Sequence, residues 1–229
     1  MSIAGAIAEL DVAIPVNGGR GRTAALPGRL ALPAPPIGLV IFAHGSGSSR
    51  RSPRNAAVAS VLHEAWIGTL LFDLLTEAEA TDRANVFDVG LLAERLASAI
   101  RFVSELEQTR HLPIGLFGAS TGAAAAVVAA AEDPRVSAVV SRGGRPDLAG
   151  RKLRVVQCPT LLVVGGDDTE VLDLNRRALA ELGSADKHLA VVPGASHLFE
   201  EPGTLDEAAR LAAEWFARHL HLEAAEGSR

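Results

Sequence analysis

LPIGLFGASTGAAAAVVAAA, residues 112–131, carries the clearest structural information in this chain. It begins with a short apolar run, Ile114 to Phe117, of the kind found in strands that are buried on both faces. Its alanine-rich second half predicts a helix, because alanine has the highest helix propensity. The turn between them reads Gly118-Ala119-Ser120-Thr121-Gly122, which is the G-x-S-x-G pattern of a nucleophile elbow.

The residue types in this turn have a chemical reason. The tight turn strains the backbone of Ser120, and glycines at 118 and 122 let strand and helix approach closely because they have no Cβ. The start of the following helix points backbone N–H groups at a developing oxyanion. Short G-x-S-x-G runs also occur by chance. Here a strand precedes the turn, a helix follows it, and an acid and a histidine come later, so we interpret Ser120 as a nucleophile.

Length and composition favour a single folded domain. The chain has 229 residues, which suits one α/β domain or two very small ones. We expect one domain over residues 1–229, with residues 222–229 as a frayed tail. Apolar residues make up 48% of the chain, far too many for a disordered protein.

Net charge and cysteine content limit the kinds of binding partner and the cellular location that we expect. The net charge of −5 provides no footprint for nucleic acid, and no apolar run reaches the length of a membrane span. The first residues lack the basic segment of a secretion signal. Cys158 is the only cysteine, which fits a reducing, cytoplasmic setting. We therefore expect a cytoplasmic protein with a small-molecule substrate, either a monomer or a homodimer, with no membrane or nucleic-acid partner.

Apolar runs alternate with amphipathic segments along the chain. The expected strands are residues 6–16, 29–32, 37–43, 69–75, 114–117, 136–140, 159–164 and 188–192. The expected helices are residues 53–66, 87–106, 171–182 and 204–220, besides the one after the elbow. We expect a loop or hairpin over residues 18–28 and irregular structure over residues 76–84. Ser52 and Thr204 are expected as helix caps, the latter in a capping box with Glu207.

This alternation predicts an α/β fold with a mostly parallel central sheet of about seven or eight strands and helices on both faces. In such sheets, ligands bind beyond the carboxyl ends of the strands. The informative polar residues fall at these ends: His44 to Ser46, Ser120, Asp168 and His197.

A serine hydroxyl needs a base to take its proton, and histidine has a suitable pKa. We assign this role to His197, in the loop after the last strand. An acid must orient the histidine, and we assign Asp168, with Asp167 as the alternative. The order Ser…Asp…His is the one expected after a nucleophile elbow. The competing interpretations are that both aspartates cap the next helix and that His197 is a surface histidine.

Two backbone N–H groups are needed to hold the oxyanion. We expect one from Thr121, directly after the nucleophile, and one from Ser46 in the glycine-rich loop after an earlier strand. This loop lacks the glycine spacings of phosphate-binding motifs. No metal or cofactor is predicted.

Several arginines follow carboxyl ends of strands. They are Arg50, Arg51, Arg54, Arg142 and Arg145. Guanidinium groups recognise anionic substrates such as carboxylates, although a solvated charged surface is the alternative. Arg142 is the better candidate because it directly ends a strand, and Arg50 and His44 complete the substrate-binding candidates.

Taken together, these residues resemble the α/β-hydrolase superfamily and, more closely, its dienelactone-hydrolase-like branch. The resemblance rests on residues 42–47, on the elbow at residues 118–122 and on residues 194–197. The chain is also similar to the small hydrolase domain that some bacterial proteins carry fused to a phosphoribosyltransferase, and we expect no such second domain within these 229 residues. The resemblance implies a Ser/Cys–Asp–His triad and hydrolysis of esters or lactones.

One departure from the family bears on the substrate. True dienelactone hydrolases use a cysteine nucleophile, whereas this chain has Ser120 there and its Cys158 at the start of a strand. We therefore expect a serine carboxylesterase. The alternatives are an acyltransferase, thioesterase, perhydrolase or lactone hydrolase with the same triad, or a non-catalytic partner of a phosphoribosyltransferase. Only residues 141–158 lie between two strands where lipases carry a cap, so we expect no substantial cap, a shallow site and small acyl esters.

Overall fold

The computed structural model describes residues 6–18 and 23–220, which contain one eight-stranded sheet in the order β1-β2-β4-β3-β5-β6-β7-β8. The strands are β1 (Ala8–Asn17), β2 (Thr23–Leu32), β3 (Gly38–Ala43), β4 (Ile67–Phe72), β5 (Ile114–Ala119), β6 (Val136–Arg142), β7 (Thr160–Gly165) and β8 (Lys187–Val192). The pairs β1–β2 and β2–β4 are antiparallel, and all other neighbours are parallel. The mostly parallel sheet predicted from the sequence is confirmed.

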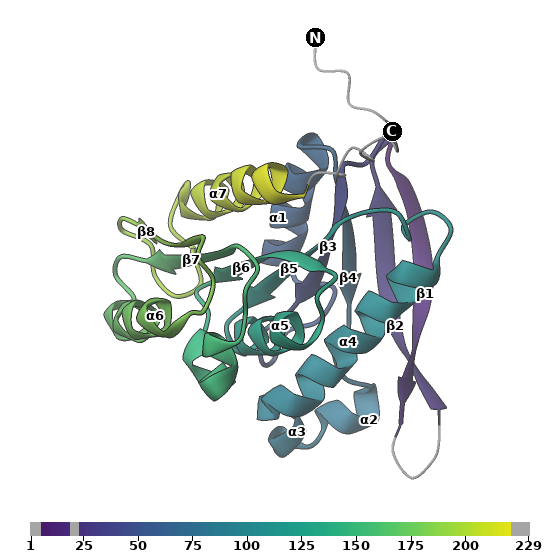
Figure 1. The fold of residues 1–229 in the computed structure, drawn as a ribbon, viewed down its shortest axis with the longest axis horizontal. Coiled ribbons are helices and arrows are strands. Elements are labelled where there is room, and N and C mark those ends of the chain that lie inside the picture. Colours follow the sequence, from purple (N-terminus) through teal and green to yellow (C-terminus); the bar gives the residue numbers. More distant parts are fainter. Residues whose placement is uncertain (1–5, 19–22, 221–229) are drawn as a thin grey trace, which may run out of the picture.

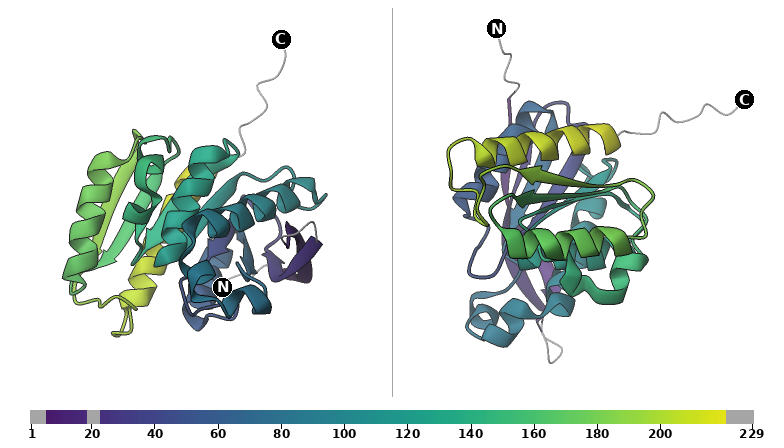
Figure 2. Two further views of the ribbon diagram at one scale, coloured as in Figure 1. Left: turned by 90° about the horizontal axis from the view of Figure 1, so that it is seen from below. Right: turned by 90° about the vertical axis from the view of Figure 1, so that its left-hand side faces the viewer.

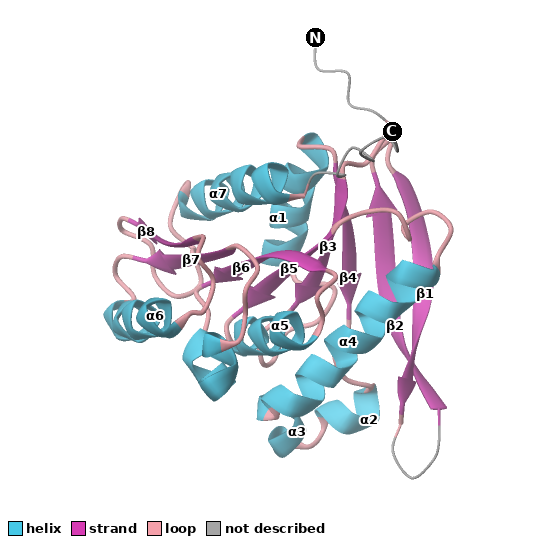
Figure 3. Cartoon of the chain, viewed as in Figure 1, coloured by secondary structure: helices cyan, strands magenta, loops and turns pink. Residues whose placement is uncertain are grey.

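Helices cover both faces of this sheet (Figures 1 and 3). They are α1 (Pro53–Glu64), α2 (Glu77–Ala80), α3 (Arg83–Phe87), α4 (Val89–Glu105), α5 (Thr121–Glu132), the 3₁₀ helix η1 (Pro146–Arg154), α6 (Thr169–Glu181) and α7 (Thr204–His219). Helices α1 and α7 pack together on one face, and α4, α5, η1 and α6 lie on the other. Figure 2 shows α6 and α7 on opposite sides of the strands. The short η1 connection leaves no cap domain between β6 and β7.

The central strands are buried on both faces, which explains their uninterrupted apolar runs. Alternate residues of β3 and β5 point to opposite layers of the core. Ile41 and Leu116 belong to the layer under α4 and α5. Phe42 and Phe117 belong to the layer under α1 and α7, with ring centroids 4.8 Å apart. The two layers fix the sheet between the helices, and the ends of its strands carry the site described below.

The N-terminal segment forms a hairpin, one of the two alternatives expected for residues 18–28, but its return strand begins earlier than the predicted Arg29. Strand β2 begins at Thr23 and passes through Pro27 and Gly28. Its pairing with β4 runs only from Gly28 to Ala31, so the missing N–H of Pro27 interrupts no bond of that ladder. The remainder of the predicted loop, residues 19–22, lies outside the described residues, as does the predicted frayed tail.

The segment after β4 is more ordered than the irregular structure that we expected over residues 76–84. Thr76 caps α2 in a capping box with Glu79, and Asp82 caps α3 through a bond from the N–H of Ala84. Asp88 caps the next helix, so α4 begins at Val89 rather than at Phe87. Three successive side-chain caps therefore shape this segment.

One predicted cap is confirmed and another is wrong. The Ser52 hydroxyl accepts a hydrogen bond from the N–H of Asn55 and Pro53 starts α1, as predicted. The capping box of Thr204 and Glu207 is not formed. Instead Gly203, with φ 80°, precedes α7, and the Thr204 hydroxyl donates to the carbonyl of Glu201. Among the described helices, none has the length and apolar character needed to cross a bilayer.

Candidate active site

Ser120 stands in a strained turn between β5 and α5. Its φ is 51° and its ψ is −124°, a backbone conformation that residues other than glycine rarely adopt. A Cβ on Gly122 would lie 2.2 Å from the carbonyl oxygen of Ala43, and one on Gly118 would lie 2.4 Å from the Cα of Ala123. Both glycines are therefore required by the close approach of strand and helix.

The backbone of Ser120 is fixed by the neighbouring strand. Its N–H donates to the carbonyl of Arg142 (3.4 Å), and its carbonyl accepts from the N–H of Arg145 (3.0 Å). A Cβ on Gly45 would lie 2.9 Å from the Cβ of Ser120, so the loop after β3 passes directly against the serine. The serine is half-buried, and its hydroxyl has no hydrogen-bond partner in the described part of the chain.

His197 and Asp168 contact each other across two loops. The Nδ1 atom of His197 lies 2.7 Å from Oδ2 of Asp168. Asp168 starts α6 but makes no side-chain cap hydrogen bond, so its carboxylate serves the histidine rather than the helix. The alternative acid, Asp167, is exposed and contacts this region through its backbone N–H, which donates to the carbonyl of Ala195.

Gly143 brings the histidine loop to the strand that holds the serine. A Cβ on Gly143 would lie 3.0 Å from the carbonyl oxygen of His197 and 3.8 Å from its Nδ1. Gly143 directly follows Arg142, whose carbonyl accepts from Ser120. The turn of Ser120 and the loop of His197 therefore both lie against residues 142–143, at the carboxyl end of β6.

Glu201 supports the histidine loop and was missed by the sequence reasoning. Its Oε2 accepts a hydrogen bond from the N–H of Ser196 at 3.0 Å. This bond lowers the pKa of Glu201. Phe199 between them is buried with φ 56°. An acid four residues after a loop histidine is too common for the sequence to single it out.

Ser46 and Thr121, the two residues expected to donate to the oxyanion, contact each other through a hydrogen bond that the sequence did not predict. The N–H of Ser46 donates to the hydroxyl oxygen of Thr121 at 3.1 Å. The N–H of Thr121 belongs to the first turn of α5, where backbone N–H groups have no partner within the helix.

His44 is engaged on both ring nitrogens. Its Nε2 accepts from the N–H of Leu74 (3.1 Å), and its Nδ1 lies 3.0 Å from the carbonyl oxygen of Gly45. Burial lowers the pKa of His44. A neutral ring with its proton on Nδ1 satisfies both contacts, so His44 joins the loop after β3 to the end of β4.

A cavity of about 800 Å³ opens beside the loop after β3, and its lining includes neither Ser120 nor His197. Ser46 and Thr121 lie in its wall, together with His44. It extends between the loop after β3, the hairpin strand β2 and the segment of α2 and α3. This volume is within the usual range for small-molecule sites, about 300–1,000 Å³.

The candidate arginines differ in their surroundings. Arg50 lines the cavity, but its guanidinium is paired with Asp73. Arg142 is buried between Phe117 and Phe199, with its guanidinium carbon 6.0 and 5.8 Å from the ring centroids. Desolvation lowers the pKa of Arg142 to about 10, with Arg54 adding to the shift. Arg142 keeps its charge at neutral pH, and its Nε and Nη1 atoms have no hydrogen-bond partner.

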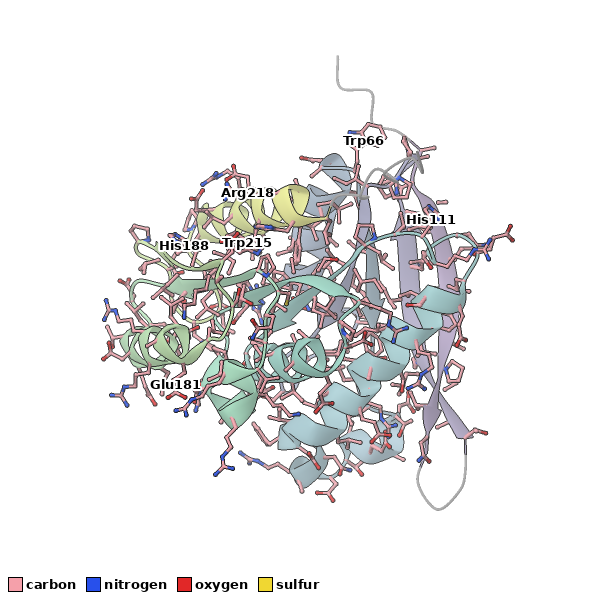
Figure 4. The ribbon with its side chains drawn as sticks, viewed as in Figure 1. Trp66, His111, Glu181, His188, Trp215 and Arg218 are labelled. Carbon is pink, nitrogen blue, oxygen red and sulfur yellow. The ribbon has the colours of Figure 1, made fainter. Side chains whose placement is uncertain are left out.

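The remaining candidates for nucleophile, base or metal ligand lie elsewhere. Burial raises the pKa of the Cys158 thiol to about 11, so it stays protonated at neutral pH. Figure 4 shows His111 and His188 on opposite sides of the molecule, in the loop before β5 and in β8. Across residues 6–18 and 23–220, no three His, Cys, Asp or Glu side chains gather as metal ligands would.

Comparison with known proteins identifies the family to which this chain belongs. The sequence model of the dienelactone hydrolase family matches residues 75–222. The crystal structure of a dienelactone hydrolase from Anabaena variabilis is 50% identical, with a TM-score of 0.86 over 93% of this chain and 99% of that chain. The esterase domain of a Rhodothermus marinus protein, 20% identical with a TM-score of 0.71, covers 93% of this chain and 99% of its own, and shares the fold.

Two curated relatives carry a different name. They come from two strains of Mycobacterium tuberculosis, are provisionally named phosphoribosyl transferases, and are 60% identical to this chain over 195 residues. The match covers 84% of this chain but 44% of each relative. The chain thus spans less than half the length of these relatives.

Proposed function

We propose that this chain, which belongs to the dienelactone hydrolase family, is a serine hydrolase that cleaves carboxylic esters through Ser120, His197 and Asp168. The observation that carries the proposal is the 2.7 Å contact between His197 and Asp168, beside the strained turn of Ser120. Strain of this kind persists where the surrounding structure enforces it, and it concentrates at functional sites.

The mechanism follows from the atoms in contact. Because Nδ1–H of His197 donates to Asp168, Nε2 is left as the base. It takes the proton of the Ser120 hydroxyl while Oγ attacks the ester carbonyl. The imidazolium then returns this proton to the leaving alcohol. Water releases the acyl group from Ser120 by the same steps.

Asp168 stabilises the charge that develops on His197, and the start of α5 stabilises the charge on the substrate oxygen. The carboxylate of Asp168 is 14% exposed, so water screens its interaction with the imidazolium only weakly. Helix α5 begins at Thr121, directly after the nucleophile, so the N–H groups of its first turn would stabilise the oxyanion.

A serine rather than a cysteine at position 120 favours ordinary esters over the lactone chemistry named by the family. Acyltransferase, thioesterase, perhydrolase and lactone hydrolase activities would use the same three residues. Product analysis with competing alcohols, peroxide, thioesters and lactones separates them from ester hydrolysis.

The name of the curated relatives supplies a second candidate, a role in phosphoribosyl transfer. Their 60% identity to this chain favours it, whereas the contact of His197 with Asp168 favours hydrolysis. Incubation with phosphoribosyl diphosphate and acceptor bases tests for transfer. A protein that binds a transferase without cleaving any ester would support the non-catalytic partner role.

The proposed function is tested with p-nitrophenyl acetate, butyrate and octanoate and the variant Ser120→Ala. We expect the wild type to cleave these esters and the variant to lose at least about 10⁴-fold in kcat. Ser60→Ala, which removes an exposed hydroxyl on α1, is the matched control and retains activity. A phosphonate probe that leaves Ser120 unlabelled in active protein would refute the proposal.

A further inference from the structure

We propose that the cavity under α2 and α3 binds the acyl half of the ester, an uncharged alkyl chain of medium length. This inference rests on the proposed function and adds the substrate class. It is carried by the position of the cavity relative to the proton donor and to the oxyanion donors.

The two halves of the ester leave Ser120 in different directions. The leaving oxygen receives its proton from His197, so the alcohol half lies on the side of that residue. The carbonyl oxygen points to Thr121, which lines the cavity together with Gly45 and Ser46 of the loop that passes against Ser120, whereas neither His197 nor Ser120 itself belongs to the lining. The substituent that continues past the oxyanion donors, away from His197, is the acyl chain.

The walls of the cavity indicate the chemistry of this chain. Its apolar lining includes Pro27, Leu75, Ala78, Ala80, Val86 and Leu92. Four charged residues also line the cavity: Arg50 and Asp73 pair with each other, and Arg51 and Glu77 are exposed and opposite in charge, so the lining carries no net charge. An uncharged alkyl chain therefore gains from burial here, at about 25 cal/mol per Å² of apolar surface.

Small side chains on α2 keep the cavity open. Ala78 and Ala80 are exposed residues of this four-residue helix and line the cavity, whereas Ala84 in α3 is exposed but lies outside its lining. Ala80→Phe and Ala78→Phe therefore fill the cavity without disturbing a core, and Ala84→Phe is the matched control.

The experiment compares p-nitrophenyl hexanoate, p-nitrophenyl acetate and hexyl acetate. We expect the wild type to prefer hexanoate over acetate by about tenfold in kcat/KM, as an apolar pocket discriminates added methylenes. Ala80→Phe and Ala78→Phe reduce this preference about tenfold, while Ala84→Phe keeps it.

Three outcomes would overturn the acyl assignment. They are a wild type whose kcat/KM falls from acetate to hexanoate, filled variants with an unchanged preference, and filled variants that lose activity on hexyl acetate instead. The last outcome would place the alcohol half in the cavity. If no ester is cleaved and Ser120→Ala changes nothing, the proposed function itself fails.

A different observation supports a second inference: we infer that the hydroxyl of Thr121 donates a hydrogen bond to the oxyanion. Thr121 is 6% exposed, and its hydroxyl oxygen accepts the hydrogen bond of the Ser46 N–H. A hydroxyl that accepts one bond still has its own proton to donate. Within the described residues this proton has no acceptor, and Thr121 lines the cavity where the oxyanion forms.

This arrangement changes the role of Ser46. Its N–H is engaged by the threonine, so it orients the hydroxyl rather than holding the oxyanion itself. The oxyanion then receives two bonds from one residue, Thr121, through its backbone N–H and its hydroxyl. Both inferences rest on the proposed mechanism, but this one concerns rate rather than substrate choice.

Thr121→Val separates the two roles because valine has the same shape and no hydroxyl. We expect kcat to fall about 10- to 100-fold with little change in KM, as for the loss of one oxyanion donor. Thr121→Ser, which keeps the hydroxyl, stays within about threefold of the wild type. Affinity for a trifluoromethyl ketone, which forms an oxyanion on Ser120, falls in parallel with kcat.

The opposite result is equally specific. If the Ser46 N–H is the donor and Thr121 only occupies it, Thr121→Val frees that donor and kcat is unchanged or higher, which overturns this inference alone. Thermal unfolding checks that the variant is folded, and Thr121→Ala repeats the measurement with a smaller side chain. Ser120→Ala must be inactive in the same assay. If it is not, the proposed function fails first.

Discussion

The two sides of the sheet contribute differently to the site. The parallel side, from β5 to β8, carries Ser120 after β5, Asp168 after β7 and His197 after β8. The other side, with the antiparallel hairpin and the helices α2 and α3, carries most of the cavity wall. The family match over residues 75–222 includes the three proposed catalytic residues but neither the hairpin nor the loop of Ser46. In the function that we propose, the first side would supply the chemistry and the second would select the substrate.

The largest test of this division concerns the parallel side. Asp168→Asn should lower kcat by about 10⁴-fold on every ester, because the amide cannot hold His197 in the tautomer that leaves Nε2 free. Asp167→Asn, one residue away on an exposed carboxylate, should remain near the wild type. Steady-state kinetics on acetate and hexanoate esters checks both. Equal losses in the two variants would contradict the assignment of Asp168.

The next test is one of stability. Gly122→Ala should lower the free energy of unfolding by about 3 kcal/mol, because the new Cβ would lie 2.2 Å from the carbonyl oxygen of Ala43 and forces the backbone apart. Gly90→Ala is the control, since its Cβ would meet only the side chain of Asp88 at 3.2 Å. Urea denaturation measures both. A neutral Gly122→Ala would show that the turn of Ser120 tolerates relaxation.

A smaller effect is expected from the support of the histidine loop. Glu201→Gln replaces the carboxylate that accepts the hydrogen bond of the Ser196 N–H with an uncharged amide. Because this holds the loop of His197 less firmly, kcat should fall about tenfold with little change in KM. The loss should be the same for acetate and hexanoate esters. Glu200→Gln, an exposed neighbour, is the matched control. A loss of kcat that depends on acyl length would instead indicate that Glu201 affects substrate selection.

The smallest effect is a pH dependence of stability on the other side of the sheet. Burial lowers the pKa of His44, and also that of His63. The unfolded chain therefore binds more protons than the folded one as pH falls below about 6.5, and stability decreases. Tm should drop between about pH 7 and about pH 5, less steeply in His44→Gln and His63→Gln. Parallel curves for the wild type and both variants would exclude this origin.

The candidate catalytic residues of the parallel side could be predicted from the sequence because they lie in short local patterns. The elbow around Ser120 is a five-residue pattern, and the order of acid and histidine follows it along the chain. The start of the hairpin's return strand was predicted too late, because Pro27 and Gly28 usually end a strand, whereas here β1 pairs past them and only β4 stops at Gly28. The Thr204 cap failed because the loop before α7 turned its hydroxyl to Glu201 instead.

The cavity and the Thr121 hydroxyl could not be predicted for a different reason. The cavity forms where four segments distant in sequence meet, and no single segment indicates its volume. The bond from Ser46 to Thr121 spans 75 residues and depends on the exact approach of two loops. The pairing of Arg50 with Asp73 likewise required the fold, and it neutralises a residue that the sequence offered as an anion-binding candidate.

The strained backbone of Ser120 determines which residue would be most stable at position 120. A residue held at φ 51° costs about 1–3 kcal/mol unless it is glycine. Glycine at position 120 would make the protein more stable and abolish its nucleophile. Selection for folding stability alone would therefore favour glycine at this position, and the proposed nucleophile is kept at a cost in stability.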